Sequence, residues 1–86
     1  MYRIKISKDA ERFLRRTTGD DRKRIEKRIS SLADNPRCEG VEKLVETKIP
    51  KYRIRQGSYR IIFSIHDDIL IIEIIDIKHR QGAYKQ

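Results

Sequence analysis

The feature that most constrains the fold is a two-residue break between two alternating segments in the second half of the chain. Residues 51–56 and 59–66 alternate apolar and polar side chains, and Gly57-Ser58 separates them. Glycine at the first central position of a two-residue loop is typical of a type II′ hairpin turn. Because loop length fixes the register of a hairpin, residues equidistant from this turn are predicted to face each other across two antiparallel strands.

This register places the side chains of the hairpin on two faces. One face is predicted to join the core and carries only apolar and aromatic residues, namely Tyr52, Ile54, Ile61, Phe63 and Ile65. The other carries Arg53, Arg55 and Arg60, with Arg55 directly opposite Arg60. Like charges directly opposite in a sheet are destabilising, and a bound polyanion would reverse that effect. A phosphate-binding face is one interpretation, and a solvated face screened by salt is the other.

The first half of the chain predicts one strand and two helices. Residues 2–6 alternate like a half-buried strand, and Ser7 can cap a helix that contains Ala10, Phe13 and Leu14. Gly19 interrupts the pattern. A second helix follows from Asp20, with an apolar stripe of Ile25, Ile29, Leu32 and Ala33, and ends at Asn35-Pro36. Residues 37–50 are expected to be irregular, as a loop or a short helix.

A third strand is predicted over residues 69–78, after a turn at Asp67-Asp68. The fold class is therefore α+β, with the order β-α-α-β-β-β and an antiparallel sheet that carries an N-terminal helical hairpin on one face. Alternation from this turn places Leu70, Ile72 and Ile74 on the core face, and Ile62, Ile69, Ile71 and Ile75 on the arginine face. So much apolar surface beside arginines suggests that a partner covers this face.

Length and charge bound the function. The 86 residues form one domain, 1–86, and carry a formal net charge of +8, which is typical of nucleic-acid binders. No segment pairs a basic face with bulky aromatic residues, so a membrane is not an expected partner. The single cysteine, Cys38, excludes an internal disulfide. The first residues lack a signal-peptide core, so a cytoplasmic location is expected.

Two motifs resemble a known family. The strands Tyr-Arg-Ile-Arg (52–55) and Tyr-Arg-Ile-Ile-Phe (59–63) are similar to those of the RelE/ParE toxin superfamily. The ending His79-Arg80 followed by Tyr84 resembles the RelE branch, whose members cleave mRNA, rather than the gyrase-directed ParE branch. The resemblance implies a ribosome-dependent endoribonuclease that acts on mRNA in the A site of the 70S ribosome without a metal or other cofactor. It also implies a RelB-type antitoxin partner, and operator DNA as a target only of the toxin–antitoxin complex.

Such cleavage needs a base for the ribose 2′-hydroxyl, positive charge at the phosphate and an acid for the leaving oxygen. The candidate catalytic residues are Arg60, Arg80, Tyr84 and His79, and the candidate substrate-binding residues are Arg53, Arg55, Lys51 and Lys78. No cluster of Asp, Glu and His at metal-ligand spacing appears.

The proton-transfer roles stay open at this point. RelE-type enzymes often carry lysines where this chain has Arg53 and Arg55, and arginine cannot act as a base because it keeps its proton. The base is therefore His79, Tyr84 or a group of the ribosome. Alternation along residues 69–78 would point Arg80 toward the core, so the strand must bend near Lys78 for Arg80 to reach the other arginines. Two alternative functions remain, a non-enzymatic ParE-like gyrase inhibitor and a basic RNA-binding module.

Overall fold

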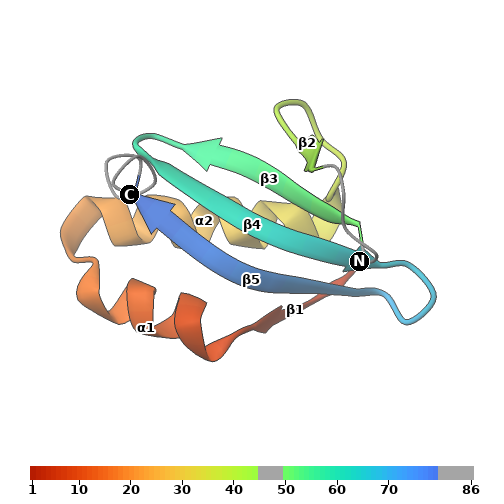
Figure 1. Ribbon diagram of the computed structural model, residues 1–86, viewed down its shortest axis with the longest axis horizontal. Helices are drawn as coiled ribbons and strands as arrows, with labels where there is room; N and C mark the ends of the chain where they lie inside the picture. Colours follow the sequence, from red (N-terminus) through yellow and green to blue (C-terminus); the bar gives the residue numbers. More distant parts are fainter. Residues whose placement is uncertain (45–49, 80–86) are drawn as a thin grey trace.

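Two helices cover one face of a five-stranded sheet in the computed structural model, which describes residues 1–44 and 50–79 (Figure 1). The elements in chain order are β1 (Arg3–Ile6), α1 (Lys8–Arg16), α2 (Gly19–Asp34), β2 (Glu42–Leu44), β3 (Lys51–Gln56), β4 (Tyr59–His66) and β5 (Ile71–His79). The strands lie in the order β1-β5-β4-β3-β2. The predicted α+β class, with a helical pair on one face of the sheet, is confirmed.

Both helices form where their sequences predict them. The Ser7 hydroxyl accepts a hydrogen bond from the Ala10 backbone amide at 3.1 Å, which caps α1, and α2 ends before Asn35. Each helix buries the predicted apolar stripe against the sheet, namely Ala10 and Leu14 of α1 and Ile25, Ile29, Leu32 and Ala33 of α2. The outer surfaces of both helices remain charged, so the helices contact the sheet mainly through these hydrophobic faces.

The hairpin of β3 and β4 has the predicted register. Gln56 pairs with Tyr59, and Arg55 pairs with Arg60. Gly57 has a φ of 61°, whereas no such positive φ occurs at Ser58, as a type II′ turn requires. The predicted core face is also correct: Ile54, Ile61 and Phe63 are buried, and Tyr52 and Ile65 pack against them.

The sheet differs from the prediction at both edges. β1 pairs with β5 in parallel, so the sheet is mixed rather than antiparallel throughout. A short strand, β2, pairs with the first half of β3 within the segment that the sequence predicts to be irregular. A three-residue strand carries too little alternation to be recognised without its partner. Residues 45–49 of the same segment lie outside the described part of the chain.

The connection between β4 and β5 is also longer than predicted. His66 pairs with Ile71, so the loop spans residues 67–70, and β5 begins at Ile71 rather than residue 69. The prediction that Leu70 joins the core is wrong, because it lies in this loop with a φ of 54° and is 51% exposed. Ile69, expected on the arginine face, lies in the same loop and is exposed as well. The two extra residues leave the alternation intact, since strand faces repeat every second residue, and Ile72 and Ile74 are in the core as predicted.

A β-bulge then reverses the alternation of β5. Ile62 pairs with Asp76 whereas Phe63 pairs with Ile74, so Ile75 is an extra residue in the strand. Beyond it, Ile77 is buried and Lys78 is exposed. Simple alternation predicts the opposite, so the change of direction expected near Lys78 occurs three residues earlier.

A polar network joins the β4–β5 loop to the chain that follows α2. The Arg37 guanidinium donates two hydrogen bonds to the Asp67 carboxylate, at 3.2 and 2.8 Å, and the Tyr2 hydroxyl donates a third at 2.5 Å. The hydrogen bonds from Arg37 and then Tyr2 lower the pKa of Asp67 from 3.8 to about 2.

Among the described residues, no helix is both long and apolar enough to cross a membrane.

Candidate nucleic-acid interface

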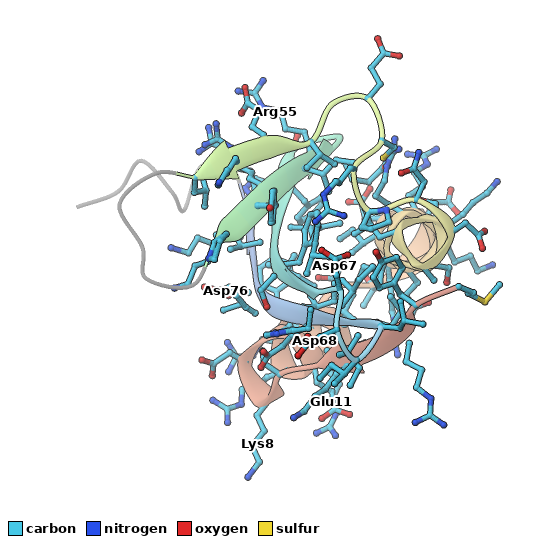
Figure 2. All side chains as sticks on the ribbon, turned by 90° about the vertical axis from the view of Figure 1, so that its right-hand side faces the viewer. Lys8, Glu11, Arg55, Asp67, Asp68 and Asp76 are labelled. Carbon is cyan, nitrogen blue, oxygen red and sulfur yellow. The ribbon has the colours of Figure 1, made fainter. Side chains whose placement is uncertain are left out.

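A row of three cations crosses the face of the sheet that the helices leave open. Arg55 of β3 lies opposite Arg60 of β4, and Arg60 lies opposite Lys78 of β5. Residues paired across neighbouring strands project from the same face, so the three side chains form one line across the sheet. We call this line the cationic row. It lies next to the hairpin turn, and Figure 2 shows Arg55 on the side of the sheet away from α2.

The neighbouring line of residues on this face mixes charges. It contains Glu42 of β2, Arg53 of β3, Ile62 of β4 and Asp76 of β5, which are paired in that order. The Glu42 carboxylate forms an ion pair with Nη2 of Arg53. The hydrogen bond and charge of Arg53 lower the pKa of Glu42, and the charges of Arg55 and Arg60 add to this effect. Glu42 is therefore an anion at neutral pH that lies in the field of three arginines.

Lys51 lies on the same face but further from the turn. It pairs with Ser64, which in turn pairs with Glu73. Ser64 is buried, and its hydroxyl is 3.0 Å from Nε2 of His66. The structure thus places Arg53, Arg55, Arg60, Lys78 and Lys51 on one face, as the sequence predicts for the first three. Ile62, Ile71 and Ile75 are half-buried on this face, where the sequence predicts them.

His79 does not join this face. His79 pairs with Tyr59 of β4. Tyr59 precedes Arg60 on the strand, so its side chain lies on the opposite face from the cationic row. The Tyr59 and His79 rings meet edge to face with centroids 5.0 Å apart, and Tyr59 also contacts Phe13 of α1. The structure therefore places His79 on the helix-facing side of the sheet, because the bulge at Ile75 reverses the faces of β5.

A small hollow of about 240 Å³ lies on that helix-facing side, beside the hairpin turn. His79 and Tyr59 line it together with Asp21 of α2. The Tyr59 hydroxyl donates a hydrogen bond to Asp21 at 3.0 Å. Burial and then this bond to a carboxylate raise the pKa of Tyr59. Tyr59 is thus held against α1 and α2 by its ring contact with Phe13 and its hydrogen bond to Asp21. The other two candidate catalytic residues, Arg80 and Tyr84, lie outside the described part of the chain.

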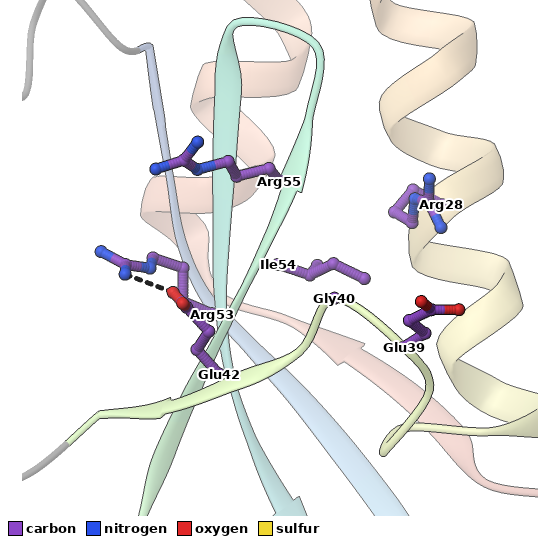
Figure 3. Close-up of a pocket in the computed structure, with 7 residues that line it drawn as sticks. All are labelled: Arg28, Glu39, Gly40, Glu42, Arg53, Ile54 and Arg55. Carbon is purple, nitrogen blue, oxygen red and sulfur yellow. Dashed lines mark hydrogen bonds and ion pairs between the residues drawn. The ribbon is translucent and has the colours of Figure 1, made fainter.

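A second hollow opens at the edge of β3, beside the first residue of β2. It has a volume of about 370 Å³ and is lined by Arg28, Glu39, Gly40, Glu42, Arg53, Ile54 and Arg55 (Figure 3). Sequence reasoning missed the two carboxylates and Arg28, because only the pairing of β2 with β3 brings Glu42 beside Arg53. Within residues 1–44 and 50–79, no group of His, Cys, Asp and Glu side chains has the arrangement of a metal site.

The sequence and the fold both match known toxins. The family model for the ParE toxin of type II toxin-antitoxin systems matches residues 4–84. The archaeal RelE–RelB complex from Pyrococcus horikoshii contains a chain that is 30% identical, with a TM-score of 0.81 over 92% of this chain and 94% of that one. No protein of curated function matches the sequence.

Two less similar structures share the fold. The RelBE2 toxin–antitoxin complex from Mycobacterium tuberculosis matches at 20% identity with a TM-score of 0.81, over 92% of this chain and 98% of that one. The isolated RelE toxin of E. coli matches at 20% identity with a TM-score of 0.78, over 92% of this chain and 84% of that one. At this level of identity the likeness establishes the architecture, a five-stranded sheet with two helices on one face.

Proposed function

The chain belongs to the ParE toxin family of type II toxin–antitoxin systems, within the RelE/ParE superfamily, and from this premise we propose that it is a ribosome-dependent endoribonuclease. The substrate is mRNA in the ribosomal A site. The observation that carries the proposal is the cationic row of Arg55, Arg60 and Lys78, which lies in register across three strands of the open face. The 30% identity to a chain of an archaeal RelE–RelB complex favours the RelE branch.

The row suits the charge that develops during the reaction. The 2′-oxygen of a ribose attacks the adjacent phosphorus, the bond to the 5′-oxygen breaks, and the products are a 2′,3′-cyclic phosphate and a 5′-hydroxyl. The pentacoordinate phosphate carries extra negative charge in the transition state, and fixed cations stabilise it. Arg60 lies at the centre of the row, between Arg55 and Lys78. We therefore assign to Arg60 the contact with the phosphate that is attacked by the 2′-oxygen. Arg55, Lys78, Arg53 and Lys51 bind the flanking phosphates.

Arg55 and Arg60 are not assigned proton transfer, because arginine keeps its proton near neutrality. Other groups must carry out the two proton transfers. The 2′-hydroxyl must lose a proton, and the 5′-oxygen must gain one. His79 reaches this chemistry only around the end of the sheet, since it lies on the helix-facing side. Tyr84 and groups of the ribosome are the other candidates for proton transfer, and Arg80 is assigned positive charge at the phosphate.

A RelB-type antitoxin is the proposed partner that holds the toxin inactive, by analogy with the RelE–RelB complexes that share the fold. The toxin–antitoxin complex, rather than the toxin alone, is proposed to bind operator DNA. Both partners suit a cytoplasmic protein, which is the location that we propose.

Induction of the toxin in cells, followed by mapping of mRNA 5′ ends, tests the proposal. We expect cuts at a fixed position within codons of translated messages. Arg60→Ala should lower the cleavage rate on the order of a hundredfold, because it removes a donor to the transition-state phosphate. Lys23→Ala, which removes an exposed cation of α2, is the matched control and should leave cleavage unchanged. Equal cleavage by both variants would refute the role of the row.

A second candidate function is the gyrase-directed activity of the ParE branch, which the name of the matching family model favours. In that case mRNA would stay intact after induction while DNA breaks accumulate. RNA binding with a steep salt dependence but no growth arrest would instead indicate a basic RNA-binding module.

A further inference from the structure

The open face of the sheet carries its own anion. Glu42, the first residue of β2, pairs in register with Arg53 of β3 and forms an ion pair with its guanidinium. In Figure 3 the Glu42 carboxylate lies against Arg53, and the side chain of Arg55 extends on the same side of the sheet. A carboxylate and a phosphate both accept hydrogen bonds from a guanidinium fork. Glu42 therefore lies where a phosphate of a bound polyanion would bind to Arg53.

This carboxylate stays charged under physiological conditions. The hydrogen bond from Arg53, followed by the charges of Arg53, Arg55 and Arg60, holds the pKa of Glu42 below its ordinary value. The other ionisable groups at the hollow are Arg28 on α2 and Glu39 in the preceding loop. Glu42 thus partly neutralises the arginines of the free protein, and it would repel a phosphate that approaches them.

The position of Glu42 also allows its carboxylate to move away from the Arg53 guanidinium. Its side chain is 63% exposed, and β2 is a three-residue strand at the edge of the sheet that contributes no residue to the buried core. Within residues 1–44 and 50–79, the shielded Nε of Arg53 has no hydrogen-bond partner, so the ion pair with Glu42 does not use the whole guanidinium fork. A phosphate, which has more acceptor oxygens than a carboxylate, could accept from this donor as well.

We propose that Glu42 is a resident counter-ion of the arginine face, which an incoming RNA phosphate must displace from Arg53. This inference rests on the proposed function, since it assigns the displaced site to RNA. Glu42 thereby weakens RNA binding in the free toxin and reduces non-specific attraction of the face to other polyanions. The negative charge of Glu42 also offsets part of the repulsion among Arg53, Arg55 and Arg60 in the free protein.

The test is the affinity for a single-stranded RNA whose 2′-oxygens are methylated, so that it binds but is not cleaved. Fluorescence anisotropy gives the Kd at low and moderate salt. Glu42→Gln removes the charge and keeps the shape of the side chain, and we expect about fivefold tighter binding at low salt, as expected for loss of one repulsion between unit charges at close range. Glu26→Gln is the matched control, because it removes a carboxylate that pairs with Arg22 at 3.3 Å on α2, away from the open face.

Two results would overturn the proposal: a Kd for Glu42→Gln equal to that of Glu26→Gln, or weaker binding than in the wild type. Loss of cleavage in Glu42→Gln with unchanged binding would also overturn it, because Glu42 would then act in proton transfer. The proposed function fails separately. If Arg53→Gln and Arg60→Gln bind the methylated RNA as well as the wild type, the face does not bind RNA at all. If these two variants bind weakly while Glu42→Gln matches its control, only the counter-ion role is wrong.

Discussion

The pair formed by Arg55 and Arg60 should oppose folding and support RNA binding, so Arg55→Gln should move stability and affinity in opposite directions. The two residues are directly opposite in the hairpin, and Arg55 is exposed. Two unit charges about 6 Å apart in water repel by about 0.7 kcal/mol. Arg55 also attracts Glu42, although the ion pair of Glu42 is with Arg53. We therefore expect a net gain of about 0.5 kcal/mol, within the range for cross-strand pairs.

Thermal unfolding measures this gain. For a domain of this size, about 0.5 kcal/mol raises Tm by about 2–4 °C. The increase should disappear near 1 M salt, where the Debye length is about 3 Å. In the methylated-RNA assay the same variant should bind more weakly. The slope of log Kd against log salt should fall by about 0.7, as expected for one lost phosphate contact to a single strand.

Lys23→Gln is the control for Arg55→Gln, because it removes an exposed cation from α2 on the other side of the sheet. It should change neither Tm nor the salt slope by a comparable amount. The reasoning is refuted if Arg55→Gln lowers Tm relative to Lys23→Gln at low salt. A gain in Tm that persists at 1 M salt would also refute it, because electrostatic repulsion would then not be its cause.

Two further predictions concern the fold. Because the pKa of Asp67 is depressed from 3.8 to about 2, the contribution of Asp67 to stability is present above pH 4 and is lost as the pH falls toward 2. The difference in Tm between the wild type and Asp67→Asn should therefore shrink over that interval, with Asp68→Asn as the control. A constant difference would contradict the role of the Arg37 and Tyr2 contacts. Ile77→Ala should lower the free energy of unfolding, measured with denaturant, by about 2–5 kcal/mol, because Ile77 is 1% exposed. Lys78→Ala should lower it by less than about 0.5 kcal/mol. The reverse order would contradict a bulge at Ile75.

The hairpin shows how much of the site could be predicted from sequence. A two-residue turn with glycine first leaves one register, so the pairing of Arg55 with Arg60 and the separation of the two faces followed directly. The helix boundaries near Ser7 and Asn35 were equally local, because capping and proline signals lie within a few residues of the ends that they set.

Errors arose where a long-range contact decides the outcome. β2 forms by pairing its three residues with the edge of β3, and nothing in those three residues indicates a strand. The bulge at Ile75 depends on fitting β5 between β4 and β1, where the Ser7 hydroxyl donates a hydrogen bond to the Ile75 carbonyl at 2.7 Å. That one extra residue moved Lys78 onto the open face and His79 away from it, so the catalytic group expected beside the arginines lies on the other side of the sheet.

The sequence by itself determined the α+β class, the helical stripes and the arginine face of the hairpin. Each of these depends on periodicity or on a turn of fixed length, which are local properties of the chain. Only the tertiary structure decided that Lys78 extends the arginines into a row and that Glu42 lies among them. Edge pairing and bulges are set by the fit between strands distant in sequence, so charge that looks uncompensated along the chain acquires its counter-ion only in the folded sheet.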